Sequence, residues 1–145
     1  GSGSGDNGSN NNGNNPDDND DNNDDTPVSN NLKITIGPVS FNATLDNNET
    51  AKAFKRLLPM TVDMSELHGN EKYYYLSKGL PTASSNPGTI RTGDLMLYGS
   101  TCVVLFYETF STSYTYTRLG RITNPSGLAS ALGSGGVNVT FEITD

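Results

Sequence analysis

The chain has 145 residues, of which 16 are Asp or Glu and nine are Lys or Arg, giving a formal net charge of −7. Seven of the Asp residues and no basic residue lie in residues 1–31, so residues 32–145 are neutral overall. A domain that is neutral overall lacks the net positive charge that attracts nucleic acids, and we expect no nucleic-acid partner.

Residues 1–31 are a low-complexity segment with eleven Asn, seven Asp, five Gly and four Ser. Val28 is the only sizeable apolar side chain in this segment, so burial cannot offset the entropy lost on ordering it. We therefore predict a disordered tether over residues 1–31. Residues 32–145 then form one domain, which is long enough to bury a core without a metal or a disulfide.

The same segment suggests a location. No apolar run approaches the ~20 residues that a membrane-spanning helix needs. A start in small residues that continues in Asn, Asp, Gly and Ser resembles the tether of a mature bacterial lipoprotein. We therefore expect a domain at the cell envelope, held to the membrane only through a lipid anchor upstream of Gly1. An ordinary interdomain linker is the alternative.

The folded domain opens with a hairpin and a helix. Apolar residues alternate over 32–36 and 39–45 around a Gly-Pro pair, which predicts two antiparallel strands. A helix is predicted over 49–58, with Asp and Asn cap candidates before it and Pro59 after it. We expect the apolar side chains of this helix to face the sheet and its basic side chains to face water: Ala53, Phe54, Leu57 and Leu58 against Lys52, Lys55 and Arg56.

A second hairpin is predicted from strands over 61–67 and 72–76, which are separated by a turn that begins at His68. Within Tyr73-Tyr74-Tyr75, alternation places the middle ring opposite its neighbours, so at most two of these rings line one site. Residues 81–88 are rich in Ser, Pro and Asn and are predicted to form a loop.

The third region begins with a strand over 95–98 and a Gly99-Ser100 pair suited to a two-residue type II′ turn. The strand over 101–107 is mostly apolar, which predicts burial on both faces. Within it we expect Cys102 to be a buried small hydrophobic residue. A loop over 110–113 and a strand over 114–122 follow.

The chain closes with a short helix over 127–132, a break at 133–136 and a strand over 137–143. About eight strands with two short helices predict a mainly β fold, a closed barrel whose ends the helices cover. Closure would remove the exposed sheet edges that promote aggregation. A β-sandwich is the alternative.

Several segments then carry a family resemblance: LLPM, VDMSELHGNEKYYYL, PGTIRTGDLMLYG, LFYETFSTSYTYTRLGRI and VNVTFEI. Over nearly all of residues 32–143 the chain resembles small bacterial cyclophilin-like proteins, and the resemblance implies an eight-stranded barrel with two helices. Classical cyclophilins are prolyl isomerases. Their Phe-His-Arg segment and Gln-Gly-Gly-Asp motif are missing here, and Thr92-Gly93-Asp94 is only distantly similar to the second of these. The resemblance therefore assigns no catalytic Arg.

The candidate site is the surface from Phe106 to Arg118. Alternation places Tyr114, Tyr116 and Arg118 on one face of the strand over 114–122, together with Gly120 and Ile122. Such a face could hold an apolar ligand on its rings and bind a carbonyl or carboxylate through Arg118; the alternative is rings that pack on the barrel surface beneath Arg118. The candidate ligand-binding residues are Phe106, Phe110, Ser113, Tyr114, Tyr116 and Arg118.

No catalytic residue, metal site or cofactor is predicted. We expect the single histidine, His68, to be an exposed turn residue, and one His with one Cys leaves no zinc cluster. The acidic run lacks the Gly and Glu positions of an EF-hand-like calcium loop. The leading hypothesis is a non-catalytic module that binds a small molecule or an extended peptide. A divergent prolyl isomerase is the alternative, and a structural or partner-binding module is a third reading.

Overall fold

The computed structural model describes residues 29–145, so nearly all of the predicted tether lies outside the described residues. Its last three residues lie against the barrel. The Ser29 hydroxyl donates to the Thr144 carbonyl at 2.6 Å, and the Asn30 carbonyl accepts a hydrogen bond from the Leu45 amide at 2.8 Å. Asn31 already pairs with Thr144, so the fold begins slightly before residue 32.

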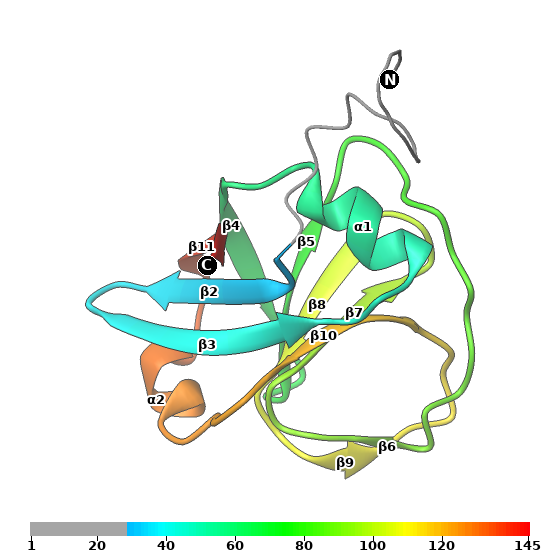
Figure 1. Cartoon of the computed structure of the whole chain (residues 1–145). Coiled ribbons are helices and arrows are strands. Elements are labelled where there is room, and N and C mark those ends of the chain that lie inside the picture. Colours follow the sequence, from blue (N-terminus) through cyan, green and yellow to red (C-terminus); the bar gives the residue numbers. More distant parts are fainter. Residues whose placement is uncertain (1–28) are drawn as a thin grey trace.

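Eight antiparallel strands close into a barrel (Figure 1). The barrel strands are β2 (Asn31–Ile36), β3 (Val39–Leu45), β4 (Met60–Leu67), β5 (Glu71–Tyr75), β7 (Asp94–Tyr98), β8 (Cys102–Phe106), β10 (Thr117–Ile122) and β11 (Val137–Thr144). Their order around the barrel is β10, β3, β2, β11, β4, β5, β8 and β7, with β7 returning to β10. The predicted closed barrel is confirmed, and the β-sandwich alternative is wrong.

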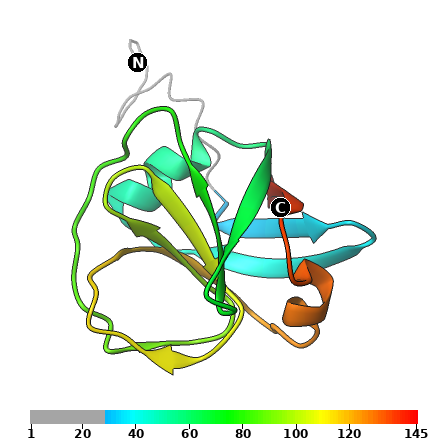
Figure 2. The ribbon, with the colours of Figure 1, turned by 180° about the vertical axis from the view of Figure 1, so that it is seen from behind.

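Two short helices lie on opposite sides of the barrel, as Figures 1 and 2 show. They are α1 (Glu49–Lys55) and α2 (Leu128–Leu132). The Asn48 side chain caps α1 by accepting a hydrogen bond from the Ala51 amide at 2.7 Å. Both helices add fully buried apolar side chains to the barrel core, Ala51 and Phe54 from α1 and Leu128 and Leu132 from α2.

The orientation of α1 differs from the prediction. The helix ends at Lys55 instead of Leu58, so Leu57 lies beyond the helix and is exposed. Lys55, which we expected in water, is 5% exposed, and its ammonium donates to the Asn30 side-chain oxygen at 2.7 Å. The long aliphatic stem explains this placement, because it covers apolar surface while the charged end reaches a polar partner.

A small two-stranded ribbon was absent from the prediction. It consists of β6 (Thr89–Ile90) and β9 (Phe110–Ser111), so part of the expected loop over 110–113 is a strand. The ribbon joins two long excursions of the chain, which also pair at Ser85 and Tyr116 through two hydrogen bonds of 2.9 Å. Figure 1 shows these excursions standing out from the barrel beside β7 and β10.

The ribbon gives the protein a second apolar cluster outside the barrel. The first cluster fills the barrel interior, where Val103 and Leu105 of β8 are buried. The second lies between the outer face of the sheet and the excursions, and it contains Ile90, Met96, Cys102, Val104, Phe106 and Tyr116. The prediction that residues 101–107 are buried on both faces is therefore confirmed, as is the burial of Cys102.

The final strand before α2 is shorter and less regular than expected. It begins at Thr117, so Tyr114 and Tyr116 precede it. Its pairing with β7 shifts between Arg118, opposite Met96, and Gly120, opposite Leu95, which leaves Leu119 as the extra residue of a β-bulge. The predicted alternation holds as far as Leu119, which lies in the barrel core. It is wrong beyond the bulge, because Ile122 also lies in the core and Arg121 shares the outer face with Arg118.

The turn between β7 and β8 is also longer than expected. Tyr98 pairs with Cys102, so three residues, Gly99 to Thr101, form the connection in place of a two-residue turn. Gly99 has a φ of 62°, which explains glycine at this position. The longer turn places Tyr98 and Cys102 opposite each other at the ends of their strands, where both reach the surface described next.

Candidate functional site

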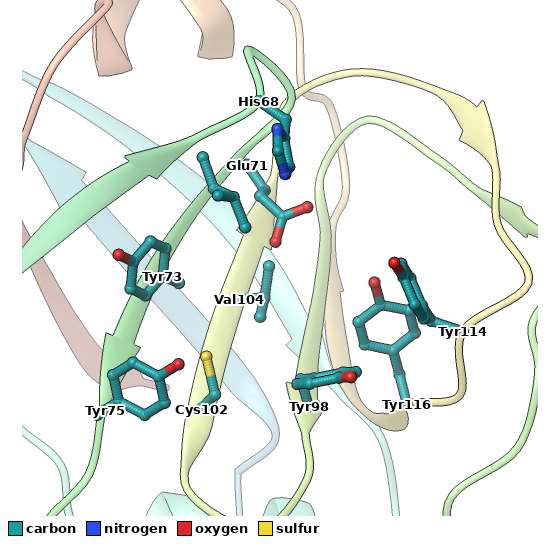
Figure 3. A pocket seen from close by; sticks show the side chains of 10 residues that line it. His68, Glu71, Tyr73, Tyr75, Tyr98, Cys102, Val104, Tyr114 and Tyr116 are labelled. Carbon is teal, nitrogen blue, oxygen red and sulfur yellow. The ribbon is translucent and has the colours of Figure 1, made fainter.

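The outer face of the barrel carries a groove with a volume of about 340 Å³, which we call the aromatic groove (Figure 3). Its lining residues come from the end of β4 and the turn after it, from β5, β7 and β8, and from the segment that leads into β10. They are Leu67, His68, Glu71, Tyr73, Tyr75, Tyr98, Cys102, Val104, Tyr114 and Tyr116.

Two sets of tyrosine rings form the walls of the groove. On one side Tyr73 and Tyr75 project from the same face of β5, with ring centroids 5.7 Å apart in an edge-to-face arrangement. On the other side the Tyr98 ring lies 6.1 Å from Tyr114 and 5.5 Å from Tyr116. These separations are those of favourable aromatic pairs, so the rings hold one another in place.

The floor of the groove is apolar and rigid. Cys102 and Val104 lie between the two sets of rings in Figure 3, and both side chains are buried. Burial raises the pKa of the Cys102 thiol, and the nearby Glu71 carboxylate raises it further. Cys102 is therefore a packing residue of the floor, with little thiolate at neutral pH.

One end of the groove is polar. His68 and Glu71 lie there, at the turn between β4 and β5 (Figure 3). Burial raises the pKa of the Glu71 carboxyl, although the nearby His68 opposes the shift. The expectation that His68 is an exposed turn residue is confirmed, and its φ of 55° places it in the left-handed region. The groove thus combines ring faces and phenolic hydroxyls with a carboxyl group at one end.

A second, polar cavity of about 550 Å³ lies beside the groove, and we call it the charged cavity. Charged side chains dominate its lining: Asp46, Arg91, Asp94, Arg118 and Arg121, with Ser85, Pro87, Thr89, Met96 and Tyr116. Arg118 is paired there, because its Nε lies 3.2 Å from Asp46 Oδ2 and its Nη2 lies 3.9 Å from Asp94 Oδ1.

Tyr116 borders both spaces. It lines the aromatic groove and the charged cavity, and only 5% of its surface is exposed. Two backbone hydrogen bonds to Ser85 fix its main chain, and the Phe106 ring packs against its ring at 5.5 Å. Burial raises the pKa of its phenol. Tyr116 is therefore a fixed partition between an aromatic and a charged surface.

The six residues predicted for the site do not lie together, and three of them line neither the aromatic groove nor the charged cavity. Phe106 is fully buried in the outer cluster, where it supports Tyr116 and Phe110 from beneath. Phe110 is partly buried on β9, and Ser113 is an exposed loop residue whose carbonyl accepts a hydrogen bond from Asn86. None of these three lines the aromatic groove.

The other three predicted residues reach the two cavities. Tyr114, 62% exposed, lines the groove with Tyr116. Arg118 lines the charged cavity and not the groove, so the structure separates this guanidinium from the exposed rings. A single surface made of Tyr114, Tyr116 and Arg118 does not form.

Sequence reasoning did not select the opposite wall or the floor as a site. Tyr98 and Tyr75 are 47% and 63% exposed, which is unusual for rings beside a core strand. Alternation within Tyr73 to Tyr75 did carry part of the signal, and its prediction is confirmed, since Tyr74 packs against the barrel core while its neighbours line the groove. Nothing local to Tyr98 indicates that it would lie opposite Tyr75.

Two features are absent from residues 29–145. Among them no group of three or more His, Cys, Asp or Glu side chains is arranged to hold a metal ion. In the same part of the chain, neither helix has the length and apolar character needed to cross a membrane.

A closed antiparallel barrel of eight strands, with two helices and a ligand-sized groove on its outer face, has the architecture of a cyclophilin-like domain. The chain belongs to the cyclophilin-like family, whose model matches residues 34–142. The resemblance seen in the sequence is thus confirmed at the level of the family and the fold.

The fold is also similar to a solution structure of a hypothetical protein from Archaeoglobus fulgidus. The TM-score is 0.54 at 21% identity, and the alignment covers 81% of this chain and 96% of the archaeal one. At this identity the similarity concerns the fold alone. No curated protein sequence matches the chain at a significant level.

Proposed function

We propose that this protein is a non-catalytic binding domain whose aromatic groove holds an apolar small molecule or an extended peptide. The observation that carries this proposal is the convergence of five tyrosines from three separate segments around an apolar floor. The fold leaves three of these rings, Tyr75, Tyr98 and Tyr114, between 47% and 63% exposed. A ligand seated between them would bury this aromatic surface, at about 25 cal/mol for each Å² removed from water.

The rigidity of the walls supports the same proposal. The rings on each side already contact one another, and Cys102 and Val104 fix the floor. A groove that is formed before binding loses little side-chain entropy when a ligand enters. The phenolic hydroxyls along its rim can donate hydrogen bonds to carbonyl groups, which suits a peptide or an amide-containing small molecule.

A tryptophan probe tests the groove, because the chain contains no Trp and selective excitation of the indole avoids emission from the tyrosines. We suggest N-acetyltryptophanamide, which is uncharged and therefore reports on the groove and not on the charged cavity. We expect a saturable change in its fluorescence, with binding about ten-fold weaker in Tyr75→Ala and Tyr98→Ala.

Leu57→Ala is the matched control, since Leu57 is an exposed apolar residue outside the groove. Its affinity for N-acetyltryptophanamide should equal that of the unmodified protein. A probe that does not saturate, or that binds both tyrosine variants as tightly as the unmodified protein, would overturn the proposal for the groove.

An isomerisation assay tests the non-catalytic part of the proposal. With a blocked peptide that contains one X-Pro bond, we expect cis/trans isomerisation to take the uncatalysed time of tens to hundreds of seconds, even at high protein concentration. Acceleration that is lost in Tyr98→Ala would replace this proposal with the prolyl-isomerase alternative.

We also propose a location at the cell envelope, which the Asn, Asp, Gly and Ser composition of residues 1–31 supports. Fractionation of cells that express the natural gene, with labelling by a radioactive fatty acid, tests it. Label on the protein and recovery with membranes are expected. Recovery of unlabelled protein in the cytosol would contradict the proposal.

A further inference from the structure

The β-bulge in β10 brings two arginines to the same side of the sheet. In a regular strand Arg118 and Arg121 would point to opposite faces. Because Leu119 is the extra residue, Arg118 lies opposite Met96 and Arg121 lies opposite Asp94, both on the outer face. Arg91, which follows β6, reaches the same cavity from the excursion, so three arginines line one space.

The charged cavity has one positive charge in excess. Three arginines face two aspartates, and Arg118 contacts both aspartates. Within residues 29–145, Arg91 and Arg121 make no ion pair. This excess stands out because residues 32–145 carry no net charge. Two guanidinium groups are thus available to an anion.

A buried acceptor lies in the same cavity. Asp94 is 2% exposed, and its Oδ2 accepts a hydrogen bond from the Arg91 amide at 2.9 Å. In the described part of the chain its Oδ1 has no hydrogen-bond partner. Arg118 Nη2, at 3.9 Å, is too far away to donate a hydrogen bond to this oxygen. An unsatisfied buried carboxylate oxygen is costly, and a ligand that donates a hydrogen bond to Oδ1 would remove this cost.

From these features we infer that the charged cavity is a second binding site, which takes a carboxylate next to an N–H donor, as in an N-acylated amino acid. The carboxylate pairs with Arg91 and Arg121, whose planar guanidinium groups can each form two parallel hydrogen bonds with it. The ligand N–H donates to Asp94 Oδ1. Binding at this site does not require a ligand in the aromatic groove, so the inference is independent of the function proposed above.

The probe that tests this site is N-acetylglycine, which has the required carboxylate and N–H and no aromatic group. Titration of the full chain, followed by nitrogen-15 NMR, should show saturable shifts of the Arg91 and Arg121 side-chain Nε signals and of the Asp94 amide. Arg91→Gln and Arg121→Gln should each weaken binding about ten-fold, because each removes a charge-assisted hydrogen bond.

Two comparisons check the chemistry of the ligand. N-acetylglycinamide, which lacks the carboxylate, should bind far more weakly than N-acetylglycine. Acetate, which lacks the N–H, should bind several-fold more weakly, and Asp94→Asn should remove most of this preference. Inorganic phosphate that binds more tightly than N-acetylglycine would overturn the assignment to carboxylates.

Arg56→Gln is the control variant, because Arg56 follows α1 and does not line the cavity. It should leave the affinity for N-acetylglycine unchanged. Preserved amide spectra show that each variant is folded. The inference is overturned if N-acetylglycine does not saturate, or if Arg56→Gln weakens binding as much as Arg121→Gln does. Acetyl-tetraglycine distinguishes two sources of this ligand. If it binds more tightly than N-acetylglycine, the natural ligand is the C-terminus of a peptide. If the two affinities are equal, the natural ligand is a free acylated amino acid.

Discussion

Lys72 donates a hydrogen bond to Glu66 from inside the barrel wall, with 2.8 Å between Nζ and Oε1. The Lys72 side chain is fully buried, whereas that of Glu66 is 23% exposed. The same ammonium donates to the carbonyls of Gly133 and Gly135, at 2.8 and 2.6 Å. One lysine therefore joins β5 to β4 and to the loop after α2, and all three of its donors are used.

Lys72→Met tests the importance of this cluster. Methionine fills a similar volume but leaves two carbonyl groups without their Lys72 donor, and it leaves Glu66 with only the donors of Tyr107 and Gly69. Because two carbonyl groups and the partly buried Glu66 carboxylate each lose a charge-assisted hydrogen bond, we expect the free energy of unfolding to fall by about 3 kcal/mol. Urea denaturation measures it. Lys52→Met, which breaks an exposed pair with Glu49, should cost less than about 1 kcal/mol; equal losses would contradict the role given to Lys72.

The Tyr107 hydroxyl should make the free energy of unfolding fall as the solution becomes alkaline. Burial and the 2.8 Å hydrogen bond to Glu66 raise the pKa of Tyr107 from 10.0 to about 12. The neutral phenol is therefore favoured by folding, and its contribution is complete below pH 10 and is lost as the pH rises towards 12. We expect Tyr107→Phe to be less stable than the unmodified protein at neutral pH, by about 1 kcal/mol.

The difference between these two proteins should shrink over that alkaline window. Denaturant titrations of both proteins at a series of pH values measure it. The comparison isolates Tyr107, because every other tyrosine is present in both chains. A difference that stays constant through the window would show that the phenol does not titrate as described.

Gly120→Ala should strain the bulged strand. A Cβ at this position would lie 2.5 Å from the Thr44 carbonyl oxygen, which belongs to the paired backbone of β3 and cannot turn aside. We expect a loss of about 1–3 kcal/mol from overpacking. Gly135→Ala is the matched control, since a Cβ there meets nothing within 4 Å. Thermal unfolding compares the two, and a larger loss in the control would contradict this account.

Cys102 provides a reporter for the aromatic groove. Its thiol is buried in the floor and its pKa is raised by burial, so alkylation by iodoacetamide at neutral pH should be several-fold slower than in the unfolded chain. Tyr75→Ala removes an exposed ring from the adjacent wall and should speed the reaction. Leu57→Ala should not. Mass spectrometry follows the labelling, and equally fast alkylation of the folded and unfolded chains would show that the floor is not closed.

Much of the barrel is encoded locally. Alternation over 32–45 predicts the first hairpin, and the apolar run over 101–107 predicts a strand buried on both faces. Such patterns follow from the two-residue period of a strand, which each segment carries by itself. The same period correctly separates Tyr74 from Tyr73 and Tyr75. The end of α1 was harder to place, because a short helix is fixed by what its side chains contact as well as by its capping residues.

The barrel, the family and the neutral charge of the domain can thus be read from residue patterns along the chain. The two cavities cannot, because they form only when distant segments pack together. The groove needs Tyr75 and Tyr98 to meet Tyr114 across segments distant in the chain, and the charged cavity needs the bulge at Leu119 to turn Arg121 towards Arg118. Both depend on how strands pair and on which face each residue takes after a shift in register, and no single segment contains that information.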